Sequence, residues 1–195
     1  HQRCLNSAQS SAAKFIIFMG HGRGDKLLGS FNKKAEDFIS NDALSEELFY
    51  KNEKFIHEQN IDFFKNKILF CFSCNSNENK SKSLSRIAIQ KGVKSFIGFG
   101  DMPTDYIAGR PFPLKAIETY KCILTRVIKN GLYIAIKKEY TIDEFIRLLK
   151  ILVTKEMQSI LFTSSKYRHK KVLLQELYKF KTNIKVYGNR YERLV

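Results

Sequence analysis

Two residues, a histidine and a cysteine, each follow an apolar segment of the chain, and together they could carry out acyl-transfer chemistry. His21 follows "KFIIFMG" and Cys74 follows "KILFCFS". With an ordinary pKa of about 8.5, only a few per cent of a thiol is ionised at neutral pH, so a cysteine nucleophile needs a base beside it. An imidazole is such a base, and we therefore interpret His21 and Cys74 as a candidate catalytic pair.

The glycine that follows the histidine could complete this site. Gly22 has no side chain, so its backbone N–H can closely approach an oxygen on which negative charge develops. The backbone N–H of Cys74 could serve as the second donor. The sequence therefore suggests an oxyanion site made by Gly22 and Cys74.

A second cysteine, Cys71, forms a C-x-x-C pattern with Cys74, which is found in redox pairs and zinc sites. Side chains three residues apart in a strand point to opposite faces unless the chain turns between them. A tetrahedral zinc site would need two more ligands. The cysteines and histidines left to supply them show no paired spacing: Cys4, Cys122, His57 and His169. We therefore expect no metal and no cofactor, and we interpret Cys71 as a small hydrophobe inside a buried strand.

Three apolar, β-prone segments are predicted to be buried strands that position these residues: Phe15 to Met19, Ile68 to Ser73 and Ser95 to Phe99. The segment "SLSRIAIQKGV" has helical spacing, and Gly92 is predicted to end that helix. Strands that alternate with helices indicate a parallel α/β sheet, whose strands all end at the same edge. His21 and Cys74 are therefore expected to meet at that edge.

The rest of the chain is predicted to be helical apart from one strand. Gly29 to Asn66 reads as loops with one or two helices, because apolar residues as far as Phe55 have helical spacing. Beyond Pro113 two long amphipathic helices are expected, the second opened by a capping box of Thr141 and Glu144. The segment "KTNIKVYGNRYERLV" is predicted to hold a final strand.

Composition limits the class of protein. The chain has 195 residues, 44% of them hydrophobic, which suits a single domain spanning 1–195. It lacks an apolar run of about twenty residues, so we expect no membrane partner. Its four cysteines are irregularly spaced, which favours a cytoplasmic protein. The net charge of +15 could attract nucleic acid or an acidic partner. Nucleic acid is a possible partner but is not favoured, because we find no recognition module.

The motifs resemble those of a known family, the caspase-like cysteine peptidases of clan CD, and within it the CHAT-type branch that includes separase and bacterial CHAT proteases. "FIIFMGHG" resembles the family's strand that ends in His-Gly, and "ILFCFSCNS" resembles the strand that ends in the catalytic cysteine. "SLSRIAIQKGVKSFIGFGDMPTDY" is similar to the helix and strand that follow. "VYGNRYERL" is similar, more weakly, to a closing strand and turn.

This resemblance implies a caspase-like three-layer sandwich with a mostly parallel sheet, and a cysteine endopeptidase with the dyad on His21 and Cys74. It also implies that Asp105 or Asp101, in "GFGDMPTDY", lines a pocket for a basic residue of a protein substrate. The chain departs from part of the family at Phe72, where metacaspases and paracaspases carry an acid.

Family domains carry one or two strands before the His-Gly strand, whereas only fourteen residues precede Phe15 here. We therefore expect N-terminal strands from outside this segment, supplied by an upstream regulatory region or a partner chain that completes the sheet. The resemblance further implies a regulated effector, in settings such as antiviral defence.

Two other functions remain open from the sequence. The chain could be a catalytically silent caspase-like binding module whose basic surface engages nucleic acid or an acidic partner. It could also be an acyltransferase or a deamidase that uses the same thiol.

Overall fold

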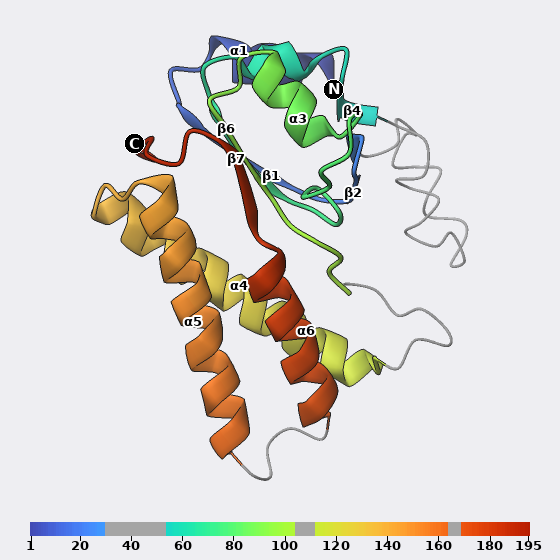
Figure 1. Cartoon of the computed structure of the whole chain (residues 1–195), viewed down its shortest axis with the longest axis vertical. Helices are drawn as coiled ribbons and strands as arrows, with labels where there is room; N and C mark the ends of the chain where they lie inside the picture. Colours follow the sequence, from blue (N-terminus) through green and yellow to red (C-terminus); the bar gives the residue numbers. More distant parts are fainter. Residues whose placement is uncertain (30–53, 104–111, 164–168) are drawn as a thin grey trace.

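The computed structural model describes residues 1–29, 54–103, 112–163 and 169–195. Within these residues the chain forms an α/β structure with helices packed against a mostly parallel sheet, as predicted (Figure 1). The predictions made for residues 30–53, including the helical spacing before Phe55, lie outside the described residues.

The main sheet has four strands in the order β1-β5-β6-β7. Their bounds are β1 (Phe15–Met19), β5 (Ile68–Phe72), β6 (Ser95–Gly98) and β7 (Lys185–Gly188). The first three are parallel, and β7 joins β6 in the antiparallel sense. All four strands were predicted from the sequence, and the parallel order of the first three is confirmed.

Helix α3 (Leu84–Gln90) connects β5 to its parallel neighbour β6. The helix ends where predicted, because Gly92 adopts a left-handed φ of 91°. The N–H of Gly92 donates to the carbonyl of Ile89 and that of Val93 to the carbonyl of Ala88. This strand–helix–strand unit carries Cys74 at its first turn and Asp101 just beyond its second strand.

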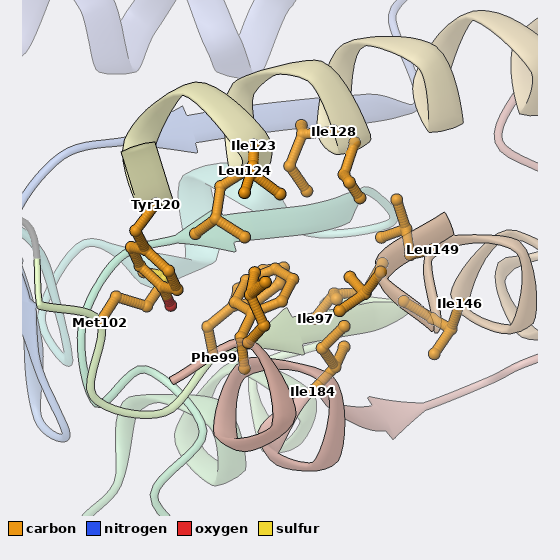
Figure 2. Packing of buried hydrophobic residues seen from close by; sticks show 14 of the residues in the cluster. Ile97, Phe99, Met102, Tyr120, Ile123, Leu124, Ile128, Ile146, Leu149 and Ile184 are labelled. Atoms are coloured by element: carbon orange, nitrogen blue, oxygen red, sulfur yellow. The ribbon is translucent and has the colours of Figure 1, made fainter. Parts of the chain in front are cut away.

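Helices cover both faces of the main sheet. One face packs against three long helices, α4 (Leu114–Lys137), α5 (Ile142–Phe162) and α6 (Lys170–Asn183), through a large apolar cluster (Figures 1 and 2). The opposite face packs against α1 (Gln2–Ser10), α3 and the 3₁₀ helix η2 (Ile61–Phe64). Side chains alternate along β5, so that Phe70 faces the first cluster and Cys71 the second.

Helix α5 begins with the predicted capping box. The Glu144 carboxylate accepts a hydrogen bond from the Thr141 N–H at 2.8 Å, and the Thr141 hydroxyl accepts one from the Glu144 N–H at 3.3 Å. The Thr141 hydroxyl also donates to the Glu144 carboxylate at 2.8 Å, and the two hydrogen bonds that this carboxylate accepts from Thr141 lower the pKa of Glu144. The helix start is therefore fixed by a purely local pair of residues.

A small second sheet was not predicted. It contains β2 (Gly22–Arg23), β3 (Lys26–Leu28) and β4 (Lys54–His57), which pair in the antiparallel sense. The helical interpretation of Phe55 was wrong, because this residue lies in β4, where pairing with β3 determines the backbone conformation. The first helix, α1, also had no counterpart in the sequence prediction.

The prediction that β1 is a buried strand was wrong as well. In the described part of the chain β1 lies at the edge of the main sheet and pairs with β5 alone. Ile17 is 40% exposed and Met19 64% exposed. An edge strand has a neighbour on one side only, so its apolar side chains are less fully covered than those of a central strand.

Candidate functional site

The turn after β5 holds Cys74 directly beyond the buried strand. Ser73 donates a backbone hydrogen bond to the Cys71 carbonyl at 2.8 Å, and Asn75 adopts a left-handed φ of 56°. Asparagine tolerates this conformation better than most residues. The chain therefore reverses immediately after Cys74, and the thiol stands at a sharp turn and is half-buried.

A buried serine, Ser76, ties this turn to the next strand of the sheet. Its hydroxyl accepts a hydrogen bond from the Phe99 N–H at 2.9 Å. The same hydroxyl lies within donating distance of two carbonyl oxygens of its own turn, those of Cys71 at 2.9 Å and Ser73 at 2.8 Å. Ser76 thus joins the carboxyl ends of β5 and β6 and fixes the turn that carries Cys74.

Close backbone packing holds the turn from the β6 side. The N–H groups of Asn75 and Asn77 donate to the carbonyls of Gly100 and Phe99, at 3.1 and 3.0 Å. A Cβ atom on Gly98 would lie only 2.5 Å from the carbonyl oxygen of Ser76. A side chain at position 98 would therefore push the Cys74 turn away from β6.

The β1 end of the site is formed by His21 and Gly22. The Gly20 N–H donates to the Phe72 carbonyl at 3.3 Å, and the His21 carbonyl accepts from the Leu28 N–H at 2.9 Å. His21 is half-buried. These bonds place the histidine between the end of the main sheet and the start of the small one.

Gly22 packs against the cysteine turn itself. A Cβ atom on Gly22 would lie 2.7 Å from the Ser73 hydroxyl and 3.1 Å from the Cys74 carbonyl oxygen. The two strand ends that were expected to meet, one with His21–Gly22 and one with Cys74, therefore lie together at one edge of the sheet. No side chain larger than hydrogen fits at position 22 without displacing this contact.

The thiol of Cys74 faces the segment that follows β6. Its sulfur donates to the Met102 carbonyl at 3.3 Å and also packs against the large apolar cluster. Asp101, the predicted substrate-binding acid, is exposed and precedes Met102 directly. The other predicted acid, Asp105, lies outside the described residues.

The two thiols of the C-x-x-C pattern differ in environment. Cys71 is fully buried in β5, and burial raises the pKa of its thiol far above the ordinary value. It therefore stays protonated and unreactive at neutral pH, which agrees with its interpretation as a small hydrophobe.

Sequence reasoning missed two groups beside the thiol. Ser76 was interpreted only as part of the polar break after the strand, because its burial and its bond to Phe99 depend on contacts with β6 that the sequence does not show. Tyr120 of α4 was read as part of an amphipathic pattern. Its hydroxyl is buried, and it has no hydrogen-bond partner among the described residues.

A separate hollow of about 200 Å³ lies between the small sheet and α3. Its charged lining consists of Asp25, Lys26, Lys54, His57, Glu58 and Lys82. Burial, together with the charges of Lys54 and Lys91, lowers the pKa of His57. The hollow therefore combines lysine side chains with two carboxylates, Asp25 and Glu58.

In the described ranges, no group of three or more histidine, cysteine, aspartate or glutamate side chains could hold a metal ion. None of the helices described is long and apolar enough to cross a bilayer. Comparison with protein-family models, with curated proteins and with solved structures gave no match.

Proposed function

We propose that this chain is a cysteine endopeptidase in which His21 and Cys74 form the catalytic dyad. The observation that carries the proposal is the packing of Gly22 against Ser73 and Cys74, which brings the residue next to the histidine to the cysteine turn. The half-buried position of the Cys74 thiol at a sharp turn supports a nucleophilic role. The resemblance of both strand-end motifs to caspase-like, CHAT-type peptidases supports the same assignment.

The proposed reaction begins when the His21 imidazole takes the Cys74 proton. The thiolate then attacks the carbonyl carbon of the scissile peptide bond, and the N–H groups of Gly22 and Cys74 stabilise the oxyanion. Collapse of this intermediate breaks the C–N bond, and His21 protonates the leaving amine. Water, deprotonated by His21, hydrolyses the thioester and restores the thiol.

The proposed substrates carry a basic residue at P1, on the amino side of the cleaved bond. Asp101 supports this choice because it lies next to Met102, whose carbonyl accepts the hydrogen bond of the Cys74 thiol. A carboxylate near the reacting sulfur would form a charge-assisted contact with arginine or lysine. Neutral side chains would leave that carboxylate without this contact and would be cleaved more slowly.

Cleavage of a peptide library with arginine, lysine, norleucine or aspartate at P1 tests this function. We expect cleavage after arginine and lysine, complete loss of activity in Cys74→Ala, and retained activity in the matched variant Cys71→Ala. A peptidyl-arginine chloromethyl ketone should add to Cys74, as located by peptide mass analysis. Full activity in Cys74→Ala would falsify the dyad, whereas cleavage after aspartate would contradict only the basic pocket.

A second candidate function is a catalytically silent scaffold that binds an anionic partner. The observation in its favour is the hollow lined by lysines and by His57, whose pKa is lowered by burial and by the charges of Lys54 and Lys91. Salt-dependent binding of single-stranded nucleic acid or polyglutamate that is weakened in Lys54→Ala would support this function, provided that no peptide is cleaved and Cys74 is not alkylated. Product masses that show acyl transfer to an amine would instead indicate an acyltransferase, and a mass increase of about one dalton would indicate a deamidase.

A further inference from the structure

The hydroxyl of Tyr120 lies in an unusual position for a core side chain. Tyr120 is 0% exposed, and its hydroxyl has no hydrogen-bond partner within the described part of the chain. A buried hydroxyl without a partner is unfavourable, because it loses its hydrogen bonds to water and gains none. Phenylalanine would fill the same space without this penalty. The oxygen atom therefore needs an explanation other than packing.

Acidic groups from three different elements act on this hydroxyl. Burial makes the largest contribution to raising the pKa of Tyr120, followed by the charges of Glu176, Cys74 and Asp101. Glu176 lies on α6, Cys74 at the end of β5 and Asp101 beyond β6. The phenol therefore remains a neutral group close to the candidate nucleophile and the candidate pocket acid.

The segment after β6 connects the nucleophile with this hydroxyl. The backbone carbonyl of Met102 accepts the hydrogen bond of the Cys74 thiol, while its side chain is buried in the cluster that contains Tyr120. Figure 2 shows the Tyr120 ring pointing from α4 toward the segment that carries Met102. A methionine side chain has three rotatable bonds and repacks easily, so it can yield its place to an entering side chain.

We propose that the Tyr120 hydroxyl determines specificity by accepting a hydrogen bond from the cationic side chain of the P1 residue. This inference rests on the proposed peptidase function. Lysine and arginine have only donors to offer, and the phenol oxygen is a neutral acceptor subject to the charges of two carboxylates, Glu176 and Asp101, that favour a cation. When the Met102 side chain moves aside, the cation satisfies the hydroxyl that has no partner in the described residues.

The substitution Tyr120→Phe tests the proposal, with Tyr133→Phe as the matched control because Tyr133 lies on the same helix and is 65% exposed. In Tyr120→Phe we expect kcat/KM for an arginine substrate to fall by roughly tenfold to a hundredfold, the range for a hydrogen bond to a charged group. The value of kcat/KM for the norleucine substrate and the rate of Cys74 alkylation by iodoacetamide should each change by less than about threefold. Tyr133→Phe should leave all of these rates unchanged.

Thermal unfolding separates this role from a structural one. Tyr120→Phe removes a buried hydroxyl that lacks a partner, so its Tm should equal or exceed that of the wild type. An equal loss on arginine and norleucine substrates, or an unchanged kcat/KM on both, would overturn the proposal. A lowered Tm would overturn it as well, because the hydroxyl would then have a partner in the resting protein.

A binding measurement distinguishes failure of this inference from failure of the peptidase function. In Cys74→Ala labelled with ¹³C at the tyrosine Cζ, N-acetyl-arginine amide should shift the resonance that Tyr120→Phe removes, and N-acetyl-norleucine amide should not. A wild-type protein that cleaves no peptide, but shows this shift, would refute the peptidase function and retain the cation site. Cleavage after arginine without any shift would refute the role of Tyr120 alone.

Discussion

Strands β1 and β5 pair in register over five positions and consist entirely of apolar residues, yet they lie in different environments. Phe15 pairs with Ile68 at one end and Met19 with Phe72 at the other. The first four residues of β5 are at most 1% exposed, whereas Ile17 and Met19 of β1 are largely accessible. Residue type thus predicts that a segment forms a strand, but the neighbours of that strand in the sheet determine how deeply it is buried.

The same difference extends to the two groups of the proposed dyad. The turn after β5 is fixed from β6 through Ser76 and by the close approach at Gly98. The end of β1 is held by the hydrogen bond from the Gly20 N–H to Phe72, by the one from Leu28 to the His21 carbonyl, and by the packing of Gly22 against Ser73. The cysteine turn is thus tied to β6, whereas the histidine end is tied to β5 and to the small sheet.

The largest expected effect is on the free energy of unfolding when the two strands are truncated at paired positions. Phe70→Ala removes a fully buried ring in contact with Phe99 and Phe145, and should destabilise the protein by about 3–5 kcal/mol. The register partner of Phe70 is Ile17. Ile17→Ala should lower the free energy of unfolding by only about 1 kcal/mol, because the Ile17 side chain is 40% exposed. Urea unfolding measures both values, and equal losses would remove the distinction between the strands.

Removal of the Ser76 hydroxyl should have the next largest effect. Ser76→Ala leaves the Phe99 N–H without its partner in the described structure and should lower stability by about 1–3 kcal/mol. Peptide cleavage should fall with it, because the Cys74 turn loses its tie to β6. The control Ser10→Ala, at an exposed helix position, should change neither quantity. A variant as stable and active as the wild type would show that the turn is held by its backbone contacts alone.

Alkaline pH should reveal the buried thiol of β5. Burial raises the pKa of Cys71 in the folded state, so above about pH 9 the unfolded chain ionises this thiol and the folded protein does not. Because the pKa of Cys71 is higher in the folded than in the unfolded state, its contribution to stability is fully present below the unfolded-state pKa. This contribution is lost as the pH rises, by up to about 1.4 kcal/mol per pH unit.

The measurement compares urea unfolding of the wild type and of Cys71→Val between pH 8 and pH 10.5. The variant should show a flatter decline with pH, whereas Cys122→Val, at an exposed position of α4, should follow the wild type. Parallel curves for the wild type and Cys71→Val would mean that the Cys71 thiol reaches solvent in the folded state.

The smallest effect is expected at the accessible end of β1. Met19→Lys should change stability by less than about 0.5 kcal/mol, because this side chain is 64% exposed. Its register partner gives the contrast, since Phe72→Lys would place a charge beside the rings of Phe99 and Phe180 and should destabilise strongly. A large loss in Met19→Lys, measured by urea unfolding, would show that β1 has a covering neighbour in solution.

The features predicted correctly from sequence depend on short-range patterns. The apolar runs of β1, β5 and β6, the glycine after α3 and the capping box of α5 each lie within a few residues. The small sheet was missed because the four residues "KFIH" of β4 carry no clear alternation, and their conformation depends on pairing with Lys26–Leu28. Phe55 had helical spacing, but tertiary pairing overrode it.

The meeting of the two strand ends was predictable to the same extent. The rule that parallel strands end at one edge brought Gly22 and Cys74 together correctly. The roles of Ser76 and Tyr120 could not be read from the sequence. Ser76 depends on a partner 23 residues away, and the environment of Tyr120 comes from three separate elements.

The tie between Ser76 and Phe99 also sets an order of events during synthesis. A ribosome delivers residues from the amino end, so the thiol of Cys74 emerges well before β6 and α4 are available to position it. Contacts between distant residues form late, because loop closure must precede them. We therefore expect the nascent chain to carry an unpositioned cysteine until the segment through Phe99 has left the exit tunnel.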